Sequence, residues 1–336
     1  MTLANANLLA QDVVARWIIE NSPKKLQIAK IWPFMGVPGG AQLYNRWNVP
    51  IGNAARLSDG TAVSPVEDDD ELEQQSFSMF EFITRYQINT RDLDLFHQPT
   101  DPEAASYALA LRRLLYGYFA WLDGEDGTQG LIPSIPAGQT IDRGGSNPLT
   151  LEALDEAFHL VSANDGKPTV IMSGTRALRT YAKLCRDKGY DVPMIPWQWY
   201  NPGTGGMEES WVESFNGVPW LINGVAAGDA SATAALQRIY FMAMGDDGQA
   251  GPTRGVTGIV PEDLRDSMFI KRQTHGVPVN QEQIIQVDAV PEELHIQPTI
   301  DVQTIMDTWV SWPVGVAIGS QGAISLIHNF TVVADV

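Results

Sequence analysis

The sequence predicts an α+β protein in which an extended two-stranded segment is followed by one long helix. Over residues 80–89, mainly apolar side chains alternate with mainly polar ones, as expected of a strand with one apolar face. Over about 101–122, apolar residues recur at helical spacing. Glycines follow that helix at once, at Gly124, Gly127 and Gly130. This order is typical of a subunit that reaches across its neighbours, and it does not indicate a small-molecule pocket.

Composition favours a protein whose surface is partly covered by partners. The chain has 336 residues, which is enough for one large or two modest domains. Charged residues make up 18%, below the usual ~25%. The 10 Trp agree with this, because aromatic residues are enriched at interfaces, although a Trp-rich ordinary core is an equal interpretation.

The charge balance argues against a protein that binds nucleic acid phosphates. The net charge is −18, the opposite sign from that of a DNA-binding surface. A container whose cargo must slide inside tolerates such a charge, and simple solubility also explains it. One cysteine, Cys185, excludes an internal disulfide or a cysteine-ligated zinc site and is expected to be a small buried residue. No apolar run is long enough to span a membrane as a helix.

The first part of the chain is expected to be a helix followed by an extended arm. Apolar residues recur at helical spacing over 1–22, and Pro23 ends that pattern. Prolines and glycines interrupt 23–50, so this stretch cannot be one regular element.

A long two-stranded excursion is expected next. The outgoing strand is placed near 49–64 and the return strand at 76–90. Between them, residues 67–73 contain six acids in seven positions. Three interpretations stay open for this tip: a solvated turn, a contact with a basic patch of a neighbour, and a calcium site. The glycine-turn spacing of a calcium loop is absent.

The helix at about 101–122 is the clearest prediction. Thr100 and Glu103 have the spacing of a capping box, and Pro102 suits the first turn. Arg112 and Arg113 lie beside the apolar stripe of this helix.

The rest of the chain alternates loosely between helix and strand. Thr150 is a candidate N-cap for a helix that continues to about Val161, and Gly189 ends a second helix that starts at Thr175. Because the β–α alternation recurs only loosely, a doubly wound parallel sheet is not predicted. The expected strands span 168–173, 215–222, 238–244, 295–318 and 322–329.

Catalytic motifs are scarce. The five histidines are scattered, without a metal-binding i, i+4 pair, and no nucleophile elbow, phosphate loop or dinucleotide fingerprint occurs. The glycines at 203–206 follow an aromatic run at 197–200, which we interpret as an aromatic-anchored surface loop, with a sugar-stacking site as the alternative. Residues 246–248 have the composition of a turn. No catalytic, cofactor or metal site is predicted.

The order of these segments resembles the major capsid proteins of tailed phages, whose HK97-like fold is shared with encapsulin nanocompartments. The most specific match is the turn Leu122–Gly127 followed by Gly130-Leu131-Ile132, similar to the glycine–acid–glycine turn after the spine helix of that family. Asn216–Pro219 matches the usual entry to a strand, and residues 314–318 match the closing strand. The order of these pieces, more than any one of them, carries the resemblance.

The resemblance implies a division of the chain and a function. It implies a major capsid protein that assembles with itself into hexamers and pentamers of an icosahedral shell around double-stranded phage DNA, without cofactor, membrane or enzymatic activity. Separate scaffolding, portal and cement proteins are the other partners it allows, and the virion, assembled in the host cytoplasm, is the implied location. The implied ranges are an N-terminal arm (1–48), an E-loop (49–92), a P-domain (93–148 and 284–325) with the spine helix, and an A-domain (149–283 and 326–336).

Two departures from the family constrain the expected assembly. Some members form a covalent crosslink from an E-loop lysine, but no lysine occurs between Lys30 and Lys167. Noncovalent contacts or a cement protein must then strengthen the shell. Many members also begin with a charged scaffolding segment, whereas this sequence starts almost at the arm, so we expect a separate scaffold or assembly without one.

Two other functions remain as alternatives. One is an encapsulin-type compartment around a protein cargo. The other is a carbohydrate-active enzyme that uses the acidic run, which is poorly arranged because a glycosidase needs two carboxylates facing each other across the substrate. For the capsid interpretation, we expect the acidic tip to pair with arginines of an adjacent subunit. The candidate inter-subunit contact residues are Glu67, Asp68, Asp69, Asp70, Arg112, Arg113 and Arg272.

Overall fold

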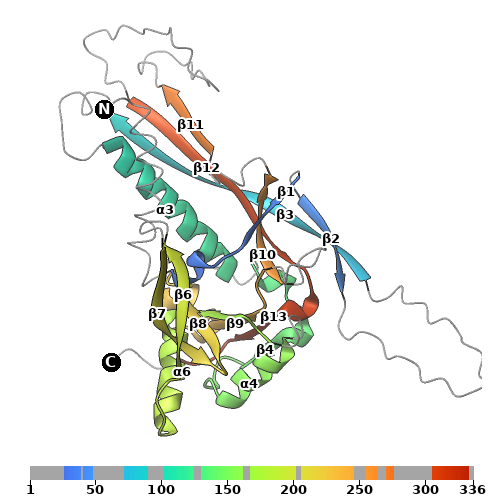
Figure 1. The fold of residues 1–336 in the computed structure, drawn as a ribbon. Coiled ribbons are helices and arrows are strands. Elements are labelled where there is room, and N and C mark those ends of the chain that lie inside the picture. The colour runs from blue at the N-terminus through green and yellow to red at the C-terminus, as the bar shows by residue number, and fades with distance from the viewer. Residues whose placement is uncertain are drawn as a thin grey trace, which may run out of the picture.

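Two β-sheets and three main helices make up the described part of the computed structural model (Figure 1). One sheet extends as a long ribbon, and the other forms the core of the body below it (Figure 1). The structure describes residues 26–38, 41–47, 72–89, 102–124, 130–161, 167–201, 206–245, 255–262, 270–275 and 305–332.

The first sheet has the strand order β1-β10-β12-β3-β2, with β11 paired to β12. All its pairs are antiparallel except β1 with β10, which is parallel. Its strands are β1 (Phe34–Val37), β2 (Ala41–Trp47), β3 (Leu72–Asn89), β10 (Val256–Pro261), β11 (Ile270–His275) and β12 (Ile305–Ile318).

Strand β3 has different partners from the one that the sequence predicted. The return strand itself is confirmed, but its first part pairs with β2, from Trp47 opposite Leu72 to Ala41 opposite Ser78. Its second part pairs with β12, from Gly315 opposite Met79 to Ile305 opposite Asn89. The predicted partner at 49–64 lies outside the described residues. The described part of 23–50 is not one regular element, as predicted, and it contains η1 (Gln27–Lys30), β1 and β2.

Helix α3 (Pro102–Asp123) confirms the predicted long helix and covers one face of the ribbon (Figure 1). Its 22 residues give it a length of about 33 Å. Tyr118 is fully buried and forms aromatic contacts with Phe82 of β3 and Trp312 of β12, and its hydroxyl donates a hydrogen bond to the carbonyl of Gly315 (3.1 Å). Long-range aromatic packing therefore fixes α3 on the ribbon.

The second sheet has the order β4-β13-β9-β5-β8-β7-β6. It is mixed, because β5 is parallel to β8 but antiparallel to β9, which agrees with the absence of a doubly wound fold. Asn216 and Gly217, both at positive φ (49° and 75°), make the tight turn between β7 and β8, as an Asn-Gly pair favours. Its strands are β4 (Thr140–Asp142), β5 (Val170–Ser173), β6 (Met194–Asn201), β7 (Gly206–Phe215), β8 (Val218–Ile222), β9 (Arg238–Met242) and β13 (Ile324–His328).

Helices α4 (Leu151–Leu160) and α6 (Thr175–Asp187) pack on the second sheet, and both were predicted. The Thr150 hydroxyl accepts a hydrogen bond from the Ala153 amide (3.2 Å), which confirms it as the N-cap of α4. Gly189 follows α6 at φ 84°, and Cys185 is buried. The short elements are η1 (Gln27–Lys30), η3 (Ile132–Ser134), η4 (Ala137–Gln139), α7 (Ala227–Ala230), η5 (Ala234–Leu236) and η7 (Gln321–Ala323).

The aromatic run at 197–200 lies in strand β6 of a regular hairpin. Most of the predicted surface loop at 203–206 lies outside the described residues, so it stays a prediction. Strand β6 contains this run and pairs antiparallel with β7, from Met194 opposite Glu213 to Asn201 opposite Gly206. The alternating apolar residues Ile195 and Trp197 were the signal in the sequence for this strand.

The predicted domain ranges and the two sheets divide the chain differently. Strands β10 and β11, within the range 149–283 assigned to the A-domain, lie in the first sheet. Strand β4, within the range 93–148 assigned to the P-domain, lies in the second sheet. Periodicity identifies strands but not their partners, so it could not show these crossings. The expected helix at 1–22 and the turn at 246–248 lie outside the described residues.

Candidate assembly surfaces

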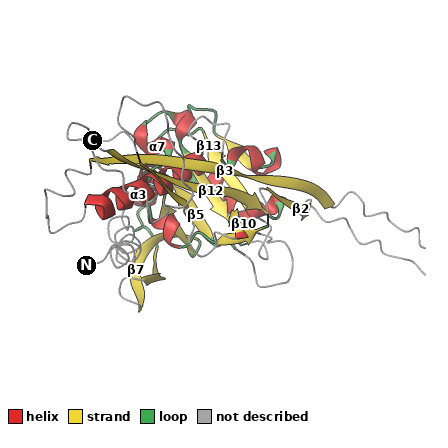
Figure 2. Ribbon diagram, turned by 90° about the horizontal axis from the view of Figure 1, so that it is seen from above, coloured by secondary structure: helices red, strands yellow, loops and turns green. Residues whose placement is uncertain are grey.

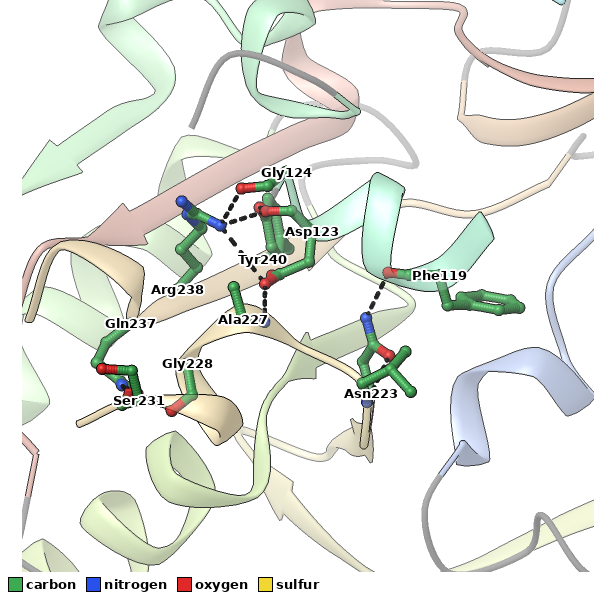
Figure 3. Close-up of polar contacts among 11 residues, drawn as sticks. Phe119, Asp123, Gly124, Asn223, Ala227, Gly228, Ser231, Gln237, Arg238 and Tyr240 are labelled. Atoms are coloured by element: carbon green, nitrogen blue, oxygen red, sulfur yellow. Dashed lines mark hydrogen bonds and ion pairs between the residues drawn. The ribbon is translucent and has the colours of Figure 1, made fainter. Parts of the chain in front are cut away.

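A buried polar network holds the C-terminal end of α3 against the second sheet (Figure 3). The guanidinium of Arg238, on β9, donates hydrogen bonds to the carbonyl oxygens of Asp123 and Gly124. The Tyr240 hydroxyl donates to the Asp123 carbonyl (3.1 Å), and the Asn223 side-chain amide donates to the Phe119 carbonyl (3.0 Å). The carbonyls of Asp123 and Gly124 lie at the helix end and have no partner within the helix, so Arg238 and Tyr240 satisfy groups that would otherwise be buried without hydrogen bonds.

The carboxylate of Asp123 is part of the same network and is almost fully buried. It accepts a hydrogen bond from the Ala227 amide (2.8 Å) and lies 3.5 Å from the Arg238 guanidinium. Burial raises the pKa of Asp123 to about 7, although Arg238 and the Ala227 amide act in the opposite direction. A carboxyl group that titrates near neutral pH therefore lies at the junction of α3 and the second sheet.

This shift predicts a pH dependence of stability. Since the folded-state pKa of Asp123 is raised above the model value of 3.8, the folded chain binds a proton that the unfolded chain releases. The free energy of unfolding should then fall by roughly 4 kcal/mol as pH rises from about 4 to about 7, and level off above. Asp123→Asn should remove this fall.

Urea unfolding of the full-length chain at fixed protein concentration across that pH range would check the prediction. Asp155→Asn is the matched control, because Asp155 is exposed on α4 and should leave the wild-type profile unchanged. A wild-type profile that rises between about pH 4 and about pH 7 would contradict the assignment of this titration to Asp123.

The ribbon face turned away from α3 leaves large apolar side chains exposed. Ile83 of β3 is 53% exposed and Trp309 of β12 is 40% exposed. Arg85 pairs with Asp307 (Nε to Oδ1 2.6 Å) and stacks over the Trp309 ring at 5.3 Å. This outer ribbon face, defined as Ile83, Arg85, Asp307 and Trp309, combines apolar area with an ordered ion pair, which is common at protein interfaces.

A second exposed apolar site lies on the β6–β7 hairpin. Trp211 is 63% exposed and Met194 is 50% exposed. Trp211 lies opposite Pro196 in the register, and Gln198 donates a hydrogen bond to Glu209 on the same face. The side chains on the other face, including Val212, are directed into the body. Neither surface was predicted from the sequence, although the isolated apolar residue Ile83 on the polar side of β3 was a signal.

The predicted contact residues are only partly within the described structure. Arg112 is half-buried on α3, donates its Nε hydrogen bond to the Tyr116 hydroxyl (2.9 Å) and stacks on that ring. Arg113 is exposed on the same helix, and Arg272 lies in β11. The four acidic residues of the predicted tip, Glu67, Asp68, Asp69 and Asp70, lie outside the described residues. Their expected pairing with arginines of a neighbour stays a prediction.

Within the described ranges, no cluster of His, Cys, Asp and Glu could hold a metal ion. His159 is exposed on α4 near Asp155 (3.8 Å). Among the described helices, none is long and apolar enough to cross a membrane.

Comparison with known proteins shows solved structures that share this fold. No protein-family model matches the sequence, and no curated protein matches it. The chain is similar to the holo-SrpI encapsulin complex of Synechococcus elongatus PCC 7942, with a TM-score of 0.61 and 15% identity over 91% of this chain and 87% of that chain. It is also similar to the capsid of a native GTA particle, with a TM-score of 0.54 and 13% identity over 90% of this chain and 89% of that chain.

A structure from Mycobacterium phage Bobi has a TM-score of 0.53 and 13% identity, with 91% of this chain and 90% of that chain covered. The first two of these neighbours are an encapsulin complex and a capsid. The likeness covers about nine-tenths of this chain in each case.

Proposed function

We propose, from the HK97-like capsid fold that this chain has and that its sequence predicted, that it is the subunit of a closed icosahedral shell of hexamers and pentamers. The observation that carries the proposal is the outer ribbon face. This face leaves the apolar side chains of Ile83 and Trp309 exposed to solvent, as is common at interaction sites. Burying that face on a neighbouring copy stabilises both the ribbon and the assembly.

The proposed cargo is double-stranded phage DNA. The net charge of the chain is −18, so its surface is not suited to binding DNA phosphates. In this proposal the shell encloses the DNA without sequence-specific binding. An encapsulin-type compartment around a protein is the second candidate, because the SrpI encapsulin complex is among the structural neighbours. We further propose self-association as the main partnership, with separate scaffolding, portal and cement proteins, in a virion assembled in the host cytoplasm.

The division into parts is also a proposal. The first sheet and α3 correspond best to the P-domain with its spine helix, and the second sheet with α4 and α6 to the A-domain. The segment between β2 and β3 corresponds to the tip of the E-loop, because the two strands are paired where it leaves and returns. Its acidic residues would contact basic side chains of an adjacent subunit, with Arg112, Arg113 and Arg272 as the candidates from sequence.

Electron microscopy of the purified full-length chain, with size-exclusion chromatography, tests the function. Closed particles are expected, and nuclease-protected double-stranded DNA inside particles from infected or induced cells would favour the phage capsid. Protected protein cargo without DNA would favour the compartment. A monodisperse monomer at every concentration and salt tested would refute shell formation.

The outer ribbon face gives a sharper prediction. Ile83→Glu should weaken assembly by about tenfold or more, because an apolar side chain buried at an interface contributes about 1.5–3 kcal/mol. The measurement is the fraction of chain in particles at fixed concentration. Ser76→Glu is the matched control, since it adds the same charge at an exposed position of the same strand that alternation places on the other face. Equal particle yields from both variants would show that this face is not an interface.

A further inference from the structure

Helix α6 carries a continuous stripe of basic side chains. Arg176, Arg179, Lys183 and Arg186 are spaced by three, four and three residues, so they lie on one face of the helix. This basic stripe is about 15 Å long. The last three of these side chains are exposed and Arg176 is half-buried. Residues 175–188 contain five cations and one carboxylate, Asp187, in a chain whose net charge is −18.

The opposite face of α6 fixes the direction of the stripe. Leu178, Tyr181 and Cys185 are buried against the second sheet. The Tyr181 ring stacks on Trp220 with centroids 4.7 Å apart, and its hydroxyl donates a hydrogen bond to the Ser214 carbonyl (2.9 Å). Because this packing prevents the helix from rotating, the basic stripe is a fixed feature of the surface.

The complementary charge is present in the same sequence. Residues 67–73 hold six acids in seven positions, and this acidic segment runs into β3, which begins at Leu72. Leu72 is paired with Trp47 at the end of the ribbon. Asp70 is two residues from Leu72, so covalent geometry keeps their Cα atoms within about 7 Å. Figure 1 shows the paired ends of β2 and β3 on the side of the molecule away from α6. A contact between the two charged regions therefore needs a second copy.

We propose that the basic stripe of α6 is the binding site for the acidic segment, residues 67–73, of a second copy of this chain. The inference rests on the proposed shell and names one of its contacts. The two surfaces lie on different parts of the subunit, so the contact is head-to-tail, the type that closes into rings. Each ion pair contributes little and is screened by salt, but the contact is repeated around every ring.

The α3 arginines are a weaker site for the same segment. Arg113 is one exposed cation, and Arg112 is half-buried with its Nε bonded to Tyr116. The basic stripe has three exposed cations, Arg179, Lys183 and Arg186, along one helix face, although the Arg186 Nε also donates a hydrogen bond, to the Ala182 carbonyl (3.3 Å). A row of carboxylates therefore gains more from α6 than from α3.

Reciprocal charge reversal tests the proposal. The acidic variant carries Asp68→Lys, Asp69→Lys and Asp70→Lys, and the stripe variant carries Arg179→Glu, Lys183→Glu and Arg186→Glu. At about 0.05 M salt, where screening is weak, each should lower the fraction of chain in particles by about tenfold. The combined variant should restore particles to within about twofold of wild type, because the pairs re-form with reversed sign. Absence of restoration would overturn the pairing, whatever the two separate variants do.

Two further measurements separate this inference from its rivals. Arg113→Glu should reduce assembly less than Lys183→Glu, and the reverse order would assign the acidic segment to α3. If the stripe variant forms particles at the wild-type yield but loses enclosed DNA, the stripe binds nucleic acid and the proposal fails.

A labelled peptide with the sequence of residues 64–76 tests the contact without assembly. It should bind the unassembled full-length chain at low salt and not the stripe variant. Absence of binding to wild type would refute the contact alone, whereas a wild-type chain that binds the peptide yet never forms particles would refute the shell alone.

Discussion

Replacing Gly130 with alanine is expected to destabilise the fold by roughly 3 kcal/mol or more. Gly130 has φ 71°, a conformation that side chains rarely adopt. A Cβ atom there would collide with the carbonyl oxygen of Trp121 and lie 2.5 Å from that of Leu122. Both obstacles are backbone atoms at the end of α3, so no side-chain rotation relieves the clash. The chain returns there to donate the Leu131 amide to the Leu122 carbonyl (3.1 Å).

Alanine substitutions at two other glycines distinguish the cost of the positive φ from the cost of the clash with α3. Gly189 has φ 84° with no heavy atom within 4 Å of a built Cβ, so Gly189→Ala measures the cost of backbone conformation alone, about 1–2 kcal/mol. Gly138→Ala has the same open space without a positive φ and should be nearly neutral. Urea unfolding of the three full-length variants gives the comparison. Equal losses for Gly130→Ala and Gly189→Ala would mean that the close approach to α3 contributes nothing.

Replacing Arg238 with methionine is expected to cost about 3–5 kcal/mol, because it leaves the buried Asp123 without its cation. The same change removes the donor to the Asp123 and Gly124 carbonyls. The loss should be smaller below about pH 6, where the raised pKa of Asp123, about 7, keeps that carboxyl protonated in the folded chain. Thermal and urea unfolding at two pH values would measure both effects.

Two companion variants identify the source of the loss. Tyr240→Phe removes one hydrogen bond to the Asp123 carbonyl and should cost only about 1 kcal/mol. Adding Asp123→Asn to Arg238→Met removes the unpaired charge and should recover a substantial part of the stability. If the double variant is as unstable as Arg238→Met alone, the buried carboxylate is not the cause.

The sequence by itself determined the elements whose signals are local. The helical stripe and the glycines after it predicted α3, which ends at Asp123 with Gly124 at φ 71°. Thr150 predicted the start of α4, and Gly189 the end of α6. These succeed because capping, φ preference and periodicity depend on residues a few positions apart. Their order along the chain was enough to indicate the HK97-like fold.

Only the tertiary structure decided which strands pair and which side chains meet. Strand β3 joins β12, more than 200 residues away (Asn89 opposite Ile305), and periodicity contains no information on such partners. From above, β3 and β12 run side by side along the length of the molecule (Figure 2). Arg238 and Asp123 are 115 positions apart and meet only because β9 passes under the end of α3. Burial, which sets the pKa of Asp123 and the outward direction of the basic stripe, is likewise a property of the assembled chain.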